Sequence, residues 1–189
     1  MLKQGFIYCV TLLLLSGNVI AQEIEGINIP DTVILTNNKS LTLNGAGIRT
    51  KFFFNIYIGA LYLEDKASGV EAVLNNAGAQ RVSMYFLYDE VSKEKLVKGW
   101  NEGFENNNDA IQFDQLKSRL EKFNSFFSTS HKDDVVFLDY IPEVGTEVRI
   151  NHELRGIISG RDFYVALLKV WLGEKPADDD LKEAMLRNL

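Results

Sequence analysis

One apolar stretch, Leu41 to Glu64, constrains the fold of this 189-residue chain more than any other segment. It reads LTLNGAGIRTKFFFNIYIGALYLE and carries Arg49 just ahead of an apolar run from Phe52 to Leu63. The run is rich in aromatic and β-branched residues and lacks helical spacing, which predicts a strand buried on both faces. Gly45 and Gly47 predict a bend, a bulge or a close backbone approach. Any function visible in the sequence should therefore lie near Arg49.

The first 21 residues have the pattern of a secretory signal. Lys3 gives a positive start, residues 6–15 form an apolar core, and Val19-Ile20-Ala21 is a small-residue cleavage pattern. The core is shorter than the roughly 20 residues of a membrane-spanning helix. We predict cleavage after Ala21, export to the periplasm, and a single domain over residues 22–189 with no integral membrane segment. An uncleaved anchor is the alternative.

Composition excludes several kinds of site. The single cysteine, Cys9, lies in the predicted signal, so the mature domain would have no disulfide, thiolate ligand or cysteine nucleophile. The chain has 26 acidic and 20 basic residues and no basic cluster, which argues against a nucleic-acid partner. His131 and His152 lack partners at metal-ligand spacing, and the chain contains no Gly-x-Ser-x-Gly elbow or dinucleotide fingerprint. We expect no metal and no cofactor.

The order of strand and helix patterns predicts the fold class. Strand patterns occupy residues 24–29, 33–35, 41–43, 52–63, 80–88, 135–141 and 147–158, and helical patterns occupy 69–77, 92–108, 109–127, 159–173 and 178–185. Ser92, Asp109 and either Asp178 or Asp179 can cap helices. Pairs of helices between blocks of strands are not the regular alternation of a doubly wound fold. The pattern predicts an α+β domain, an antiparallel sheet covered on one face by helices.

Three regions of the chain together resemble the chalcone isomerase superfamily, in its bacterial chalcone isomerase-like branch. They are LNGAGIR at 43–49 with IGALYLE at 58–64, the segment from Val91-Ser92 to Trp100, and GRDF at 160–163 with WLG at 171–173. The resemblance implies an open-faced β-sandwich, with a ligand cleft between a large antiparallel sheet and its layer of helices. It also implies a role for Arg49. Plant isomerases of this family place an arginine at the cleft to guide addition of a phenoxide to an enone, and the fatty-acid-binding branch uses it to hold a carboxylate.

The other isomerase residues are not matched. The position of the isomerases' cleft threonine holds Tyr57, Tyr88 lies too far upstream for the family's tyrosine, and the asparagine's place holds Lys95. Tyr57 and Tyr62 are five residues apart and point to opposite faces of a strand, so only one of them can line the cleft. We expect Arg49 and Tyr57 to bind the ligand. The alternatives are an ion-paired or solvent-facing arginine and a core tyrosine with a hydrogen-bonded hydroxyl.

These observations leave three functional hypotheses. The first is a secreted, non-catalytic protein that binds a small amphipathic ligand, a fatty acid or an aromatic acid, with its head group at Arg49. The second is an isomerase of the intramolecular-lyase type, in which Arg49 orients an oxyanion and a tyrosine or water donates the proton. The third is a protein-interaction module with a vestigial cleft, docking through residues 109–127 or the C-terminal helices. The sequence does not indicate an oligomeric state.

Overall fold

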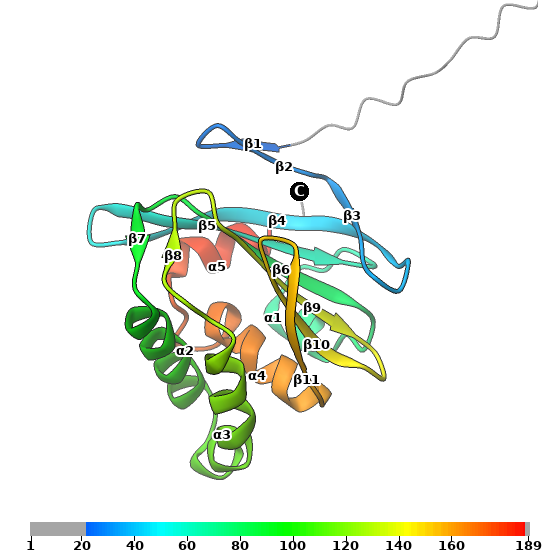
Figure 1. Ribbon diagram of the computed structural model, residues 1–189. Coiled ribbons are helices and arrows are strands. Elements are labelled where there is room, and N and C mark those ends of the chain that lie inside the picture. The colour runs from blue at the N-terminus through cyan, green and yellow to red at the C-terminus, as the bar shows by residue number, and fades with distance from the viewer. Residues whose placement is uncertain (1–21, 188–189) are drawn as a thin grey trace, which may run out of the picture.

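The computed structural model describes residues 22–187, in which a seven-stranded antiparallel sheet carries helices on one face (Figure 1). The strands lie in the order β11-β10-β9-β6-β5-β4-β3. Their bounds are β3 Thr32–Ile34, β4 Ser40–Lys51, β5 Phe54–Leu63, β6 Gln80–Phe86, β9 Val135–Ile141, β10 Gly145–Ile150 and β11 Glu153–Ile158. Two small two-stranded sheets complete the fold: β1 (Gln22–Ile24) pairs with β2 (Ile27–Ile29) as a hairpin, and β7 (Glu90–Val91) pairs with β8 (Ser130–His131), which follows α2 and α3 in the chain. The predicted α+β architecture is confirmed.

Five helices cover the sheet on the side opposite to β1 and β2 (Figure 1). They are α1 Val70–Asn75, α2 Lys93–Asn107, α3 Ala110–Ser125, α4 Arg161–Leu172 and α5 Asp179–Met185. Three of them begin at the predicted caps, because Ser92, Asp109 and Asp178 each accept a hydrogen bond from a backbone amide three residues further on. Local sequence therefore determines where α2, α3 and α5 start.

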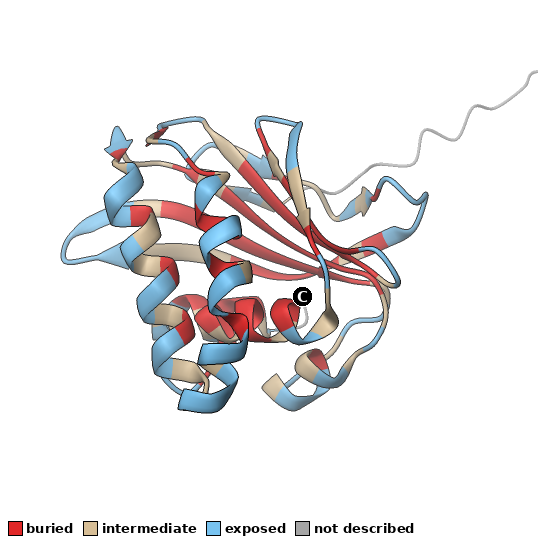
Figure 2. Cartoon of the chain, turned by 60° about the horizontal axis from the view of Figure 1, so that its bottom comes forward, coloured by how far each residue is buried: buried red, intermediate tan, exposed pale blue. Residues whose placement is uncertain are grey.

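The central strands of the sheet are buried on both faces, as Figure 2 shows in red. Along β5, Tyr57, Leu61 and Leu63 pack into the cluster beneath the helices, whereas Ile58 and Tyr62 pack into a second cluster on the other face. This alternation follows from the two-residue period of a strand. The prediction that Tyr57 and Tyr62 point to opposite faces is confirmed.

The start of the apolar run differs from the prediction. Phe52 and Phe53 do not belong to a buried strand but form the turn between β4 and β5, with exposed fractions of 84% and 95%. Phe54, the first residue of β5, is 54% exposed. The chain reverses here because Phe52 adopts a positive φ of 59°. Glycine and asparagine are the residues that usually indicate this conformation in a sequence, and neither is present in the turn.

The two glycines of β4 are explained by α5, which packs across this strand. A Cβ atom on Gly45 would clash with the carbonyl oxygen of Ala184, and one on Gly47 would lie 2.5 Å from the Cβ of Ala184. The register of β4 on β5 also shifts between Leu43 and Gly45. Both a bulge and a close backbone approach, predicted from the glycines, are therefore present.

The predicted signal, its cleavage site after Ala21 and Cys9 lie outside the described residues. Between residues 22 and 187, no helix is long and apolar enough to cross a membrane. The same part of the chain contains no group of three or more histidine, cysteine, aspartate or glutamate side chains placed to hold a metal ion.

Candidate ligand-binding site

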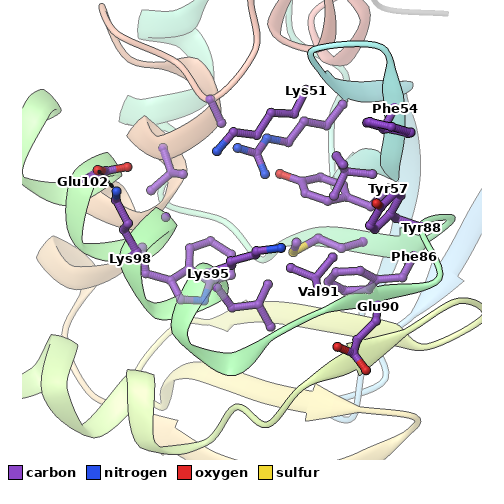
Figure 3. Close-up of a pocket in the computed structure, with 18 of the residues that line it drawn as sticks. Lys51, Phe54, Tyr57, Phe86, Tyr88, Glu90, Val91, Lys95, Lys98 and Glu102 are labelled. Carbon is purple, nitrogen blue, oxygen red and sulfur yellow. Dashed lines mark ion pairs between the residues drawn. The ribbon is translucent and has the colours of Figure 1, made fainter.

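A cavity of about 640 Å³ lies on the helix-covered side of the sheet, between β4, β5 and β6 on one side and α2 on the other (Figure 3). The apolar residues of its wall are Phe52, Phe54, Ile56, Tyr57, Met84, Phe86, Tyr88, Val91, Leu96, Trp100, Val170 and Ala177. Small-molecule sites typically have volumes of about 300–1,000 Å³ and mostly apolar walls. This cavity therefore has the size and lining of a ligand site.

Regular secondary structure explains why these side chains converge. Tyr57 and Phe86 are register partners on β5 and β6, so their side chains stand on the same face of the sheet. On α2, Leu96 and Trp100 are four residues apart and project from one side of the helix. Gly99 lies beside them, and a Cβ atom there would meet nothing within 4 Å, so the helix leaves space toward the cavity.

Arg49 lies in the cavity wall opposite Tyr57, its register partner on β5. Its Nε atom is buried and has no hydrogen-bond partner among residues 22–187, and no carboxylate in that range lies within 4.0 Å of its nitrogens. The nearby Asp178 instead accepts hydrogen bonds from the amides of Thr50 and Leu181, each at 2.9 Å. The guanidinium is therefore free to bind an anionic ligand.

Tyr57 shares the cavity with Arg49 but is also a core residue. Only 3% of it is exposed, and its hydroxyl accepts a hydrogen bond of 2.8 Å from the indole Nε1 of Trp171. Burial raises the pKa of this hydroxyl, although the positive charge of Arg49 opposes the shift. Tyr57 thus presents a neutral ring to the cavity, and its role as a ligand contact stays a prediction.

Trp100 supplies a second unpaired donor in the cavity wall. The residue is 4% exposed, its ring packs against Phe123 and Trp171 at centroid distances of 5.4 and 5.6 Å, and its buried Nε1 has no hydrogen-bond partner in the described chain. The sequence predicts Trp100 as a core residue from its helical spacing. The structure adds an unsatisfied N–H, which helical spacing could not reveal.

The mouth of the cavity is lined by charged, exposed side chains, of which Lys51, Lys95 and Lys98 are basic and Glu90 and Glu102 are acidic (Figure 3). Lys98 pairs with Glu102 at 3.6 Å, whereas Lys51 and Lys95 have no ion-pair partner within 4.0 Å among the described residues. Two lysines are therefore available at the entrance for the charged end of a ligand.

Tyr88 and Lys95 are two of the lining residues that spacing alone did not place in the site. Tyr88 follows the end of β6 and packs edge-on against Phe54 at a centroid distance of 5.3 Å, while Lys95 lies in the first turn of α2. They meet at the cavity because the chain returns from β6 through β7 to α2 beside the β4–β5 hairpin (Figure 1).

A second cavity, of about 540 Å³, lies on the opposite face of the sheet, and its cations are already paired. Arg81 binds Asp139 with two short contacts of 2.5 and 2.6 Å, and Arg149 pairs with Glu147 at 3.2 Å. Because carboxylates of the protein neutralise these arginines, this cavity is a weaker candidate for an acidic ligand than the one at Arg49.

The open cleft between a large antiparallel sheet and its helix layer, with an arginine in its wall, defines the class of this protein. The chain matches the family model described as chalcone isomerase-like over residues 21–187, and it belongs to that family. The resemblance inferred from the residues is confirmed at this level.

Among the solved structures that match is the fatty-acid binding protein of Arabidopsis thaliana, with a TM-score of 0.62 and 15% sequence identity. The match covers 83% of this chain and 96% of the plant chain, which at this identity shows a shared fold. None of the curated protein sequences matches this chain.

Proposed function

We propose that this protein is a non-catalytic binder of a small amphipathic acid, a fatty acid in the first place, and that Arg49 holds the carboxylate. The observation that carries the proposal is the Arg49 guanidinium in the wall of a largely apolar cavity, with no carboxylate partner in the described part of the chain. Arg49 is half-buried, and its buried Nε–H without a partner is costly; a carboxylate that binds the guanidinium through two parallel hydrogen bonds removes that cost.

The rest of the cavity suits the apolar part of such a ligand. Each methylene group that leaves water contributes about 0.8 kcal/mol, and the wall beyond Arg49 offers aromatic and aliphatic side chains such as Ile56, Met84 and Leu96. The plant protein that shares the fold is named as a fatty-acid binding protein, which supports this ligand class. An aromatic acid stacked on Phe86 or Tyr88 is the alternative within the same site.

An isomerase of the intramolecular-lyase type is the second candidate, because Arg49, Tyr57 and Tyr88 share one cavity. Two observations argue against it. The hydroxyl of Tyr57 already accepts a hydrogen bond from Trp171, and burial raises the pKa of this hydroxyl. The described residues that line the cavity also include no histidine that could act as an acid or base. We expect chalcones to close at the uncatalysed rate in the presence of the protein, measured by absorbance. The third hypothesis, a module with a vestigial cleft, is disfavoured because a cavity of about 640 Å³ reaches Arg49.

We also propose that the protein acts in the periplasm. The support is the signal pattern over residues 1–21 and the start of the family match at residue 21, next to the predicted cleavage point. Expression of the full chain in a Gram-negative host should yield a periplasmic protein whose mass corresponds to a start at Gln22. A cytosolic protein that keeps Met1, or one anchored in the inner membrane, would contradict this.

Native mass spectrometry of the purified protein tests the ligand proposal most directly. We expect one lipid-sized molecule per chain, which organic extraction identifies as a carboxylic acid. After the ligand is stripped, titration with lauric, palmitic and oleic acids should restore one-to-one binding. A protein that purifies empty and binds neither these acids nor cinnamic acid would remove the proposal.

A further inference from the structure

The tip of the β4–β5 hairpin presents three consecutive phenylalanines to solvent. Phe52, Phe53 and Phe54 are 84%, 95% and 54% exposed. Single exposed apolar residues are common, but a contiguous group usually marks an interaction site. Phe52 also has a φ of +59°, a conformation that glycine or asparagine adopts at less cost in a hairpin turn. Neither burial in the core nor the geometry of the turn explains why aromatic residues occupy these positions.

Basic side chains accompany this aromatic tip. Lys51 directly precedes it, and Lys95 on α2 faces it across the mouth of the cavity, both exposed and without an ion-pair partner among the described residues (Figure 3). Of the acidic residues of the rim, Glu102 pairs with Lys98 at 3.6 Å, and Glu90 lies 3.7 Å from Nε2 of His131, a contact that is an ion pair only when the histidine is protonated. The chain has a net charge of −6, yet the rim has three lysines, Lys51, Lys95 and Lys98, against two glutamates, Glu90 and Glu102.

We propose that the tip formed by Phe52, Phe53 and Phe54 inserts into the surface of an anionic lipid bilayer, with Lys51 and Lys95 at the level of the head groups. Exposed aromatic side chains next to lysines are the chemistry by which proteins bind membrane interfaces, through buried apolar area and attraction to anionic lipid. The hairpin also projects past the helix layer at the left of Figure 1. A narrow convex turn suits insertion into lipid, whereas a stable protein interface needs about 800 Å² per partner.

The location of the tip gives docking a consequence for the ligand. Phe52 and Phe54 belong both to the tip and to the cavity wall, so a docked molecule holds the cavity mouth against the lipid surface. An amphipathic ligand then passes between bilayer and cavity without crossing water. This consequence rests on the proposed function, but the docking itself does not.

Vesicle flotation with residues 22–189 tests the docking. We expect the protein to float with phosphatidylcholine vesicles that contain phosphatidylglycerol, and less with phosphatidylcholine alone. Phe53→Ser should lower the partition coefficient about tenfold, as expected when one large aromatic side chain no longer leaves water. The matched control is Ile111→Ser, which removes an apolar side chain that is 72% exposed at the start of α3 and should bind vesicles like the wild type.

A fluorescent reporter checks the depth of insertion. In Phe53→Trp the new indole should be quenched by brominated lipid, whereas the buried Trp100 and Trp171 of the wild type should not. The proposal is overturned if the wild type stays unbound with both vesicle compositions or if Phe53→Ser floats like the wild type. It is equally overturned if the tip instead drives a concentration-dependent dimer that Phe53→Ser abolishes and no vesicles are bound.

The two proposals fail separately. Phe53 does not line the cavity, so Phe53→Ser should bind fatty acid in detergent-free buffer like the wild type. Arg49→Met should float with vesicles like the wild type even though its fatty-acid affinity is lowered. A wild type that binds vesicles but no fatty acid therefore refutes the ligand proposal alone, and a wild type that binds fatty acid but no vesicles refutes the docking alone.

Discussion

The guanidinium carbon of Arg49 lies 5.5 Å from the centre of the Tyr57 ring, across the β4–β5 pair. The hydroxyl of the same ring accepts a hydrogen bond from Trp171 of α4. The helix layer thus fixes the ring, and the ring supports the cation from one side by a cation–π contact. The Nε–H of Arg49 has no partner among residues 22–187, which leaves it available to an acidic ligand.

Replacing Arg49 should separate ligand binding from folding. Since Nε has no hydrogen-bond partner between residues 22 and 187, Arg49→Met should fold with a thermal midpoint close to that of the wild type. Its fatty-acid affinity should fall about 10- to 100-fold, the value of a lost charge-assisted hydrogen-bonded pair. Arg49→Lys keeps the charge but loses the two parallel hydrogen bonds of a guanidinium, so its affinity should lie between those of the wild type and Arg49→Met. Isothermal titration with palmitic acid measures all three, and equal affinities would show that the head group binds elsewhere.

The hydrogen bond between Trp171 and Tyr57 should stabilise the fold. Tyr57→Phe leaves the buried Nε1 of Trp171 without an acceptor and should cost about 1–3 kcal/mol in the free energy of unfolding. Trp171→Phe should cost more, because it also leaves a cavity. The double variant should show a coupling energy of about 0.5–1.5 kcal/mol in urea denaturation. Strictly additive losses would mean that the bond contributes nothing net.

Gly45 should tolerate no side chain. In Gly45→Ala the new Cβ would clash with the backbone of Ala184, so α5 must move away from β4 at a cost of about 1–3 kcal/mol. Gly99→Ala is the matched control, since its Cβ meets nothing within 4 Å and a helical glycine replaced by alanine gains about 0.5–1 kcal/mol. Thermal unfolding of both variants should give shifts of opposite sign. A neutral Gly45→Ala would contradict the packing of α5.

Glu64 should contribute to acid sensitivity. Its carboxylate accepts a 2.7 Å hydrogen bond from the amide of Ala79 and pairs with Lys39 at 3.3 Å, and these contacts lower its pKa from 4.5. A lowered folded-state pKa means that the stabilisation is complete above about pH 4.5 and is lost as pH falls through the lower folded value. Glu64→Gln should therefore be less stable at pH 7 and show a flatter decline below pH 4.5. Urea denaturation across this range checks both points, and parallel pH profiles would refute the assignment.

Local sequence signals predicted much of the fold and part of the site. Capping residues located the starts of three helices, and the two-residue period of a strand placed Tyr57 and Tyr62 on opposite faces of the sheet. The glycines before Arg49 indicated a close backbone approach, which the structure shows to be that of α5. Each of these signals depends on neighbours within a few residues. The prediction that the buried strand begins at Phe52 was wrong. Hydrophobicity alone does not show where an apolar run turns, and this turn contains no glycine or asparagine that would indicate it.

The sequence by itself determined most elements of this protein, its sheet-and-helix class and the arginine that precedes its longest apolar run. Tertiary structure alone decided that Arg49 has no carboxylate partner among residues 22–187, that Tyr88 and Lys95 join its cavity, and that Phe52 and Phe53 are exposed to solvent. The physical reason is that secondary structure follows from short-range backbone preference and periodicity. Whether a charge has a partner or an aromatic side chain is covered depends on segments far apart in the chain, which only folding brings together.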